Sequence, residues 1–270
     1  MSDIKVVAEI GWNHMGDMEL AEKMIVAASK SGADIVKFQT WSASNLKPGA
    51  WDQDGRREIY KKAELSAEQH VFLKKVCDDN NVQFSTSLFA LKDLPIVDGL
   101  GIHYMKVPSH EVYNTELVKK LASIFPILLV STGASTWREV ELLNESLEDA
   151  KSEIVLMHCV SSYPCPPENV NLLRLEALKR FNRTIGYSGH YYGIEDAIGA
   201  MVMGAKFIEK HFTIDQDLPG RDNKFALLPN QLKLLVDQKQ LFEKMLLNKG
   251  LDYQEIEADT VNNYRGRWAG

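Results

Sequence analysis

The sequence predicts a single-domain α/β protein with the (β/α)₈ TIM-barrel fold, and two observations support this prediction. Eight short apolar or β-branched runs recur along the 270 residues, and helix-like patterns lie between most of them. Strands and helices that alternate in this way form a parallel sheet with right-handed crossovers. Eight such units in about 230 residues fit a closed barrel better than an open doubly wound sheet. We expect the barrel to cover residues 1–250 and a C-terminal tail to cover residues 251–270.

Each expected strand is a short apolar run whose last residues are polar. The strands are expected at residues 4–10, 34–40, 82–88, 103–108, 127–132, 154–160, 184–190 and 206–212. Helices are expected at residues 18–30, 66–81, 136–147, 169–181, 193–204 and 228–248, and a weaker one at 91–98. Ser66 and Thr136 each open a capping box, which fixes two of the helix starts. The long polar segment 41–64 is typical of a lid or an interface rather than a plain connection.

Composition excludes several classes of protein. A hydrophobic content of 45% is ordinary for a globular protein, and the net charge of −6, without any basic run, disfavours nucleic acid as a partner. No apolar run approaches the roughly 18 residues of a transmembrane helix, so no membrane association is expected. The three cysteines form no paired framework, and no export signal is evident. We therefore expect a cytoplasmic protein.

Two of the expected strands end in a histidine, and they are neighbours in the sequence. His190 ends the seventh strand and His211 the eighth, with a helix pattern between them. Imidazoles on the same ends of adjacent parallel strands can converge on one ion, and Glu209 is near enough to serve as a third ligand or to order one. Two satisfied core histidines are the structural alternative, but their matched placement favours a metal site.

The C-terminal ends of the other expected strands carry lysines, hydroxyl groups and carboxylates. A barrel places its reactive groups at these ends. Lys37 and Lys106, together with serine and threonine hydroxyls, make a plausible clamp for a phosphate or carboxylate. Either lysine alone could be a structural ion-pair partner, but buried lysines together need an anion to offset their desolvation. Glu9 and Glu111 are candidate acid–base groups.

These motifs, taken in order, resemble the N-acetylneuraminate (sialic acid) synthase family over about residues 4–240. The matching stretches are AEIGWNHMG at 8–16, VKFQ at 36–39, FST at 84–86, KVPSHE at 106–111, STG at 131–133, HC at 158–159, YP at 163–164, SGH at 188–190 and EKHFT at 209–213. No single one of them is specific, but the ordered series is.

The resemblance implies an enzyme that condenses phosphoenolpyruvate with an open-chain aldose such as N-acetylmannosamine. The products would be a 2-keto-3-deoxy acid and phosphate, and the cofactor a divalent metal ion, Mn²⁺ or Mg²⁺. The residues it assigns to phosphoenolpyruvate are Lys37, Thr86, Lys106, Ser109, Ser131 and Ser188. It assigns His190, His211 and Glu209 to the metal, Gln39, Tyr163 and Asp222 to the sugar, and Glu9 and Glu111 to catalysis. A homodimer is implied as well.

Four positions depart from the family pattern, and most of them lie on the expected sugar side. Gly189 replaces an Asp, Ser161 an Asn, Leu88 an aromatic residue and Arg221 a Pro. The missing carboxylate at Gly189 predicts an altered metal affinity or orientation. Members of the family usually continue into a small antifreeze-like domain that supplies an arginine to the sugar. We expect this chain to lack that domain, and the tail arginines are a weak substitute.

Three alternatives remain open from the sequence. A synthase of the 3-deoxy-octulosonate 8-phosphate or 3-deoxy-heptulosonate 7-phosphate type would need a second anion clamp, which Arg56, Arg57 or Arg221 could supply. A non-catalytic barrel subunit would have no physical need for the polar strand ends. A metal-dependent sugar isomerase or aldolase would explain the histidines but not the anion clamp.

Overall fold

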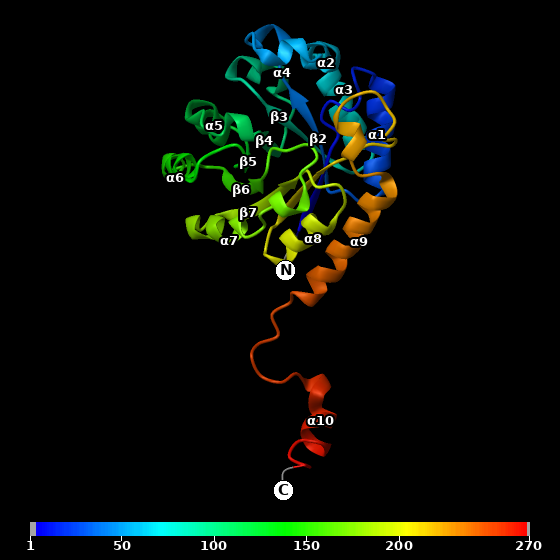
Figure 1. The fold of residues 1–270 in the computed structure, drawn as a ribbon, viewed down its shortest axis with the longest axis vertical. Coiled ribbons are helices and arrows are strands. Elements are labelled where there is room, and N and C mark those ends of the chain that lie inside the picture. Colours follow the sequence, from blue (N-terminus) through cyan, green and yellow to red (C-terminus); the bar gives the residue numbers. More distant parts are fainter. Residues whose placement is uncertain (1–3, 269–270) are drawn as a thin grey trace.

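Eight parallel strands close into a barrel in the structure, a computed structural model that describes residues 4–268 (Figure 1). Each strand pairs with the next one in the sequence, and β8 pairs with β1 to complete the ring. The strands are β1 (Lys5–Glu9), β2 (Ile35–Thr40), β3 (Gln83–Leu88), β4 (Tyr104–Val107), β5 (Ile127–Ser131), β6 (Glu153–Cys159), β7 (Thr184–Gly189) and β8 (Phe207–His211). The predicted (β/α)₈ barrel is confirmed.

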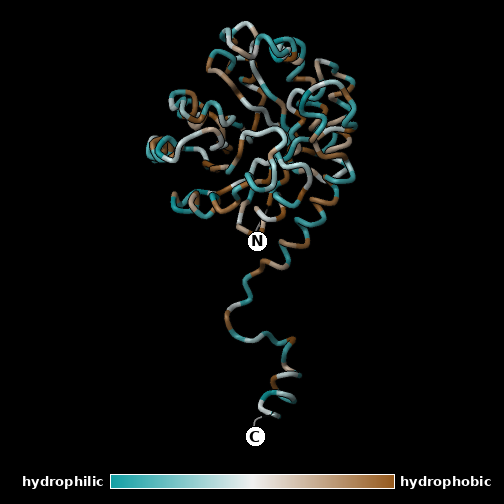
Figure 2. The backbone as a smooth tube through the Cα atoms, viewed as in Figure 1, coloured by the Kyte–Doolittle hydropathy of each residue, from teal (hydrophilic) through white to brown (hydrophobic). Residues whose placement is uncertain are grey.

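Helices cover the outside of the barrel, and apolar and polar residues alternate along them (Figure 2). They are α1 (Met18–Lys30), α2 (Arg56–Ala63), α3 (Ala67–Asp79), α4 (Leu94–Val97), α5 (Thr115–Ala122), α6 (Trp137–Ser146), α7 (Arg174–Leu178), α8 (Glu195–Val202) and α9 (Pro229–Met245); a further helix, α10 (Ala258–Asn263), lies in the tail. Both predicted capping boxes are present: the Ser66 and Thr136 hydroxyls accept from the backbone three residues on, which satisfies amide groups that the helix leaves unpaired.

Three helices are present where the sequence pattern predicts none: α2, α5 and α10. Helix α5 was not expected, because it is only two turns long; its Asn114 cap accepts from the Leu117 amide and is the signal that could have found it. The segment 41–64, predicted to be a lid or an interface, carries α2 and two 3₁₀ turns. Trp41 anchors it by donating its indole N–H to the Tyr60 carbonyl at 3.0 Å and by packing edge-on against the Tyr60 ring.

The barrel interior is layered, because every second residue of a strand points inwards. Nearer the N-terminal ends of the strands lies an apolar layer, here called the floor: Val7, Ile35, Leu129, Val155, Met157 and Phe207. The next inward position on each of these strands is polar: Glu9, Lys37, Ser131, Cys159 and Glu209. The polar layer therefore sits on the floor and faces the C-terminal end of the barrel.

After α9 the chain leaves the barrel, and α10 lies in an extended tail well apart from it (Figure 1). The tail side chains face solvent, with Leu251 fully exposed and Ile256 90% exposed. Within residues 4–268, no helix combines the length and the apolar character that crossing a membrane requires.

Candidate functional site

Four charged side chains form a connected group in the polar layer, here called the charge cluster: Glu9, Lys37, Lys106 and Glu209. The Lys37 Nζ lies 2.5 Å from Glu9 Oε2, and the Lys106 Nζ lies 2.8 Å from Glu209 Oε1. A distance of 3.8 Å between Lys37 Nζ and Glu209 Oε1 joins the two pairs. All four side chains are at most 6% exposed. The cluster brings together the two lysines and two of the carboxylates predicted from the sequence.

The two carboxylates of the charge cluster differ in acidity. Burial raises the pKa of Glu9 to about 7, and the adjacent Lys37 opposes that rise. Burial also disfavours ionised Glu209, but Lys106 and Lys37 overcome it and lower the pKa of Glu209 to about 2. Burial lowers the pKa of Lys106, and the Glu209 carboxylate opposes this. With both lysines charged and Glu9 protonated, two ammonium groups face a single carboxylate. A net positive, desolvated pocket of this kind suits an anionic ligand.

Several hydroxyl groups surround the cluster, and two of them are buried without a hydrogen-bond partner: Ser85 Oγ and Ser131 Oγ. Ser188 donates to Glu209 Oε1 at 3.0 Å, and Ser109 Oγ accepts from the Gly133 amide at 3.2 Å. Buried hydroxyls without a partner cost free energy, and a phosphate or carboxylate oxygen would remove this cost. The predicted anion-binding serines thus lie around the lysines.

Thr86 requires a correction. Its hydroxyl lies 2.7 Å from the Thr40 hydroxyl, which in turn contacts His70 Nε2 of α3 at 2.8 Å, so Thr86 points to the outside of the barrel. The adjacent Ser85 and Ser87 point inwards, and Ser87 Oγ accepts from Lys37 Nζ at 2.8 Å. A shift of one residue along a strand reverses the face of the side chain. Phe84 and Leu88, the apolar residues two positions before and after Thr86, are the signal for its face.

The two histidines meet at the C-terminal ends of β7 and β8, with ring centres 5.3 Å apart. The His190 Nδ1 is 2.8 Å from the Val160 carbonyl oxygen, which fixes the ring and leaves Nε2 for a ligand. The His211 Nδ1 is buried without a hydrogen-bond partner, and burial holds the pKa of His211 well below its usual value. A neutral imidazole with an unpartnered nitrogen is able to bind a metal ion.

Glu209 makes its hydrogen bonds within the charge cluster, and its role at the metal stays a prediction. Both of its oxygens accept from Lys106, and one also accepts from Ser188. Glu209 faces inwards like His211 but lies one layer nearer the floor. Across the described part of the chain, no three His, Cys, Asp or Glu side chains gather as a metal site. Two imidazoles therefore fit a divalent cation only if water or substrate oxygens complete its coordination.

The residues predicted for the sugar occupy different parts of the site. Tyr163 packs on His190, with ring centres 4.0 Å apart, and Asp222 Oδ2 lies 3.6 Å from His211 Nδ1. Burial raises the pKa of Asp222 to about 6. Gln39 donates to Glu9 Oε1 at 2.6 Å, next to the charge cluster. Glu111 is half-buried on the loop after β4 and accepts from Asn114 at 3.1 Å; its pKa is raised by burial.

Gly189 also requires a correction, because its missing side chain would not lie beside the two histidines. A Cβ atom at this position would meet Asp196 Oδ2 and the Tyr187 ring, both on the outside of the barrel. Sequence reasoning also missed Cys159, whose Sγ lies 3.9 Å from His190 Nδ1. Its position at the end of the neighbouring strand, paired with Ser188 two residues before His190, was the available signal.

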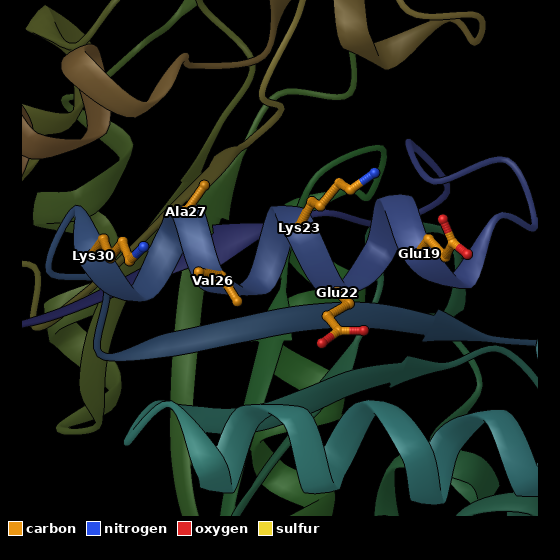
Figure 3. A pocket seen from close by; sticks show the side chains of 6 residues that line it. All are labelled: Glu19, Glu22, Lys23, Val26, Ala27 and Lys30. Carbon is orange, nitrogen blue, oxygen red and sulfur yellow. The ribbon is translucent and has the colours of Figure 1, made fainter.

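A separate hollow lies on the outer surface of α1 and is no part of this site (Figure 3). The lining residues all belong to that one helix: Glu19, Glu22, Lys23, Val26, Ala27 and Lys30. The buried charge cluster and histidines, at the carboxyl ends of the strands, are the stronger candidate for chemistry.

A (β/α)₈ barrel with a buried pair of lysines and two histidines at this end defines an enzyme that acts on an anionic substrate. Residues 24–250 match the NeuB family, and the chain belongs to it. The chain is 35% identical to an N,N'-diacetyllegionaminic acid synthase of Campylobacter jejuni, over 91% of this chain and 78% of that protein. It is 36% identical to the N-acetylneuraminate-9-phosphate synthase of Drosophila melanogaster, over 87% of this chain and 67% of that protein.

A solved structure supports the same relationship. The N-acetylneuraminic acid synthetase of Leptospira borgpetersenii, crystallised with citrate, superposes with a TM-score of 0.91 at 30% identity, covering 98% of this chain and 92% of that one. The resemblance to sialic acid synthases that the motifs suggested is confirmed, and the protein is a sugar acid synthase of this family.

Proposed function

We propose that the enzyme condenses phosphoenolpyruvate with an open-chain aldose, forming a 2-keto-3-deoxy nonulosonic acid and inorganic phosphate. The observation that carries the proposal is the buried lysine pair of the charge cluster, which faces serine hydroxyls without partners. Phosphoenolpyruvate is a small, highly charged anion, and its phosphate and carboxylate would satisfy both the lysines and the hydroxyls. Lys37, Lys106, Ser109, Ser131 and Ser188 are its proposed ligands.

The reaction forms a bond between C3 of the enol and the aldehyde carbon, and the aldehyde oxygen takes up a proton. Water then adds at C2, and the tetrahedral intermediate expels phosphate by cleavage of the C–O bond. Glu9 is the proposed group for activating the water, because a pKa of about 7 lets it exchange a proton at neutral pH. Glu111 is proposed to protonate the aldehyde oxygen; the two roles could be exchanged.

A divalent cation, Mn²⁺ or Mg²⁺, is proposed to bind His190 and His211 and would supply polarisation of the aldehyde. The unpartnered Nδ1 of His211, and the Nε2 that the His190 contact with Val160 leaves for a ligand, support this assignment. Asp222 and Tyr163, which lie against the two imidazoles, are proposed to face the sugar together with Gln39. Homodimer formation and a cytoplasmic location stay predictions of the sequence.

We infer that the acceptor is a free sugar, because each arginine considered for a second anion clamp has a carboxylate partner. Arg56 pairs with Asp54 at 2.5 Å, and Arg57 pairs with Asp52 at 2.6 Å. Arg221 also lies 3.8 Å from Asp54. Each arginine that could form a second anion clamp thus has a carboxylate partner, which a sugar phosphate would have to displace.

The test is phosphate release from phosphoenolpyruvate with Mn²⁺, across free and phosphorylated hexoses and N-acyl hexosamines. Release that depends on one free sugar, with formation of a 2-keto-3-deoxy acid, is expected. Substrate with a heavy isotope in its bridging oxygen should yield labelled phosphate, because the C–O bond breaks. Failure to bind phosphoenolpyruvate would remove the proposal, and binding without release for any sugar would favour the non-catalytic alternative.

A further inference from the structure

Directly behind the two histidines, on the outside of the barrel, lies a buried polar group that the proposed reaction does not use. It consists of Tyr187 on β7, Asp196 on α8 and Lys210 on β8, and is here called the outer network. Lys210 Nζ donates to both Asp196 oxygens, at 3.0 and 2.8 Å, and the Tyr187 hydroxyl donates to Asp196 Oδ2 at 2.8 Å. All three residues are at most 5% exposed.

The outer network joins the two strands that carry the histidines. Lys210 directly precedes His211, and its Nζ also donates to the Tyr191 carbonyl at 2.7 Å, one residue beyond His190. Helix α8 packs on both β7 and β8 and brings the Asp196 carboxylate between them. The Asp196 carboxylate therefore contacts side chains of both strands from outside the barrel. The Lys210 ammonium group links this carboxylate to the loop after β7.

Gly189 is what makes room for this arrangement. It is an extended strand residue, so its backbone does not need glycine. A Cβ atom there would overlap Asp196 Oδ2 and the edge of the Tyr187 ring. Any side chain at position 189 would push the carboxylate away from Lys210 or the ring away from the carboxylate. The glycine is explained by the outer network and not by the lumen of the barrel.

We propose that the outer network is a positioning device that sets the spacing and orientation of His190 and His211 for the divalent cation. The inference rests on the proposed metal site and adds the residues that act through its ligands. A buried ion pair is a weak source of stability but a strong source of fixed geometry, because both groups must stay together to remain satisfied. Groups hydrogen-bonded directly to metal ligands commonly change metal affinity by 10- to 100-fold, and the outer network, which reaches both histidines through the adjoining backbone, is expected to act at the lower end of that range.

The test compares Mn²⁺ affinity, measured by electron paramagnetic resonance without substrates, in wild type and variants. Asp196→Asn should weaken Mn²⁺ binding about tenfold or more. The matched control is Asp34→Asn, because Asp34 pairs with Lys239 at 2.8 Å in another strand–helix contact, at the opposite end of the barrel. Asp34→Asn should reduce thermal stability but leave Mn²⁺ affinity unchanged.

Two gentler variants keep the proposal testable if Asp196→Asn does not fold. Tyr187→Phe keeps the ion pair between Lys210 and Asp196 and removes the hydrogen bond from the tyrosine hydroxyl. Gly189→Ala keeps all the polar groups but displaces the Asp196 carboxylate or the Tyr187 ring. Both should weaken Mn²⁺ binding while the fold, followed by circular dichroism, stays intact. Wild-type affinity in these variants overturns the positioning role alone. A wild-type protein that binds no Mn²⁺ overturns the proposed metal site itself, and the inference with it.

Discussion

Replacing Lys106 by Met distinguishes a structural lysine from one that binds substrate. Lys106 is 3% exposed and holds Glu209, whose pKa of about 2 depends on the two nearby lysines. Removing the ammonium leaves a buried carboxylate with only Lys37, at 3.8 Å, as a charged partner. Breaking a buried pair from one side costs about 3 kcal/mol of folding free energy. Lys106→Met should lose stability of this order in urea denaturation.

The double variant Lys106→Met with Glu209→Gln separates the two roles. Because it removes both charges, it should recover most of the lost stability, as isosteric replacements of buried pairs do. Phosphoenolpyruvate affinity, measured by calorimetry, should not recover: one lost charge-assisted hydrogen bond, worth about 1.5–3 kcal/mol, weakens binding roughly 10- to 100-fold. Glu209→Gln alone should retain binding. Recovery of affinity in the double variant would falsify the assignment of Lys106 to substrate.

Three further predictions follow from the same geometry. Glu9→Gln and Glu111→Gln should each reduce kcat about 100-fold or more while the calorimetric affinity for phosphoenolpyruvate changes little; lost affinity would make either residue structural. Thr86→Val should cost about 1 kcal/mol of stability without weakening phosphoenolpyruvate binding, whereas Ser87→Ala should weaken it; the reverse result would restore Thr86 to the site. His14 is buried and its pKa is lowered to about 4, so its contribution to stability is complete above its unfolded pKa of 6.5 and is lost as pH falls towards 4, by up to about 3 kcal/mol. His14→Asn keeps an acceptor for the Gly16 amide and should flatten this pH dependence in urea titrations; an unchanged slope would contradict it.

The barrel could be predicted because its signal is local and repeated. Eight apolar runs with polar ends, separated by helical patterns, leave few other folds possible. The lysines and histidines were predictable for the same reason, since the fold brings all strand ends to one face. Helix α5 was too short to give a clear pattern, and only its Asn114 cap marks it.

The errors came from side-chain direction, which depends on the strand period and on neighbouring strands. The inward-facing residues of β3 are Ser85 and Ser87, not Thr86. Because side chains alternate between the two faces of a strand, an error of one residue assigns the side chain to the wrong face. The contact of Glu209 with Lys106 was equally out of reach, because it joins two strands that are far apart in the sequence. Gly189 was interpreted from the site side, although the residue that fills its space comes from α8. Contacts between strands and helices that are far apart in the sequence cannot be predicted from the pattern of a single segment.

The apolar floor has a consequence for the order of events in catalysis. Val7, Ile35, Leu129 and their neighbours close the barrel below the charge cluster, so the cluster is reached from the side of the histidines. A substrate held by Lys37 and Lys106 would then lie beneath the sugar. Phosphoenolpyruvate would have to enter first, and phosphate, released against the lysines, would leave last, after the sugar acid above it. Steady-state kinetics should therefore show compulsory-order binding, with phosphate competing against phosphoenolpyruvate and not against the sugar.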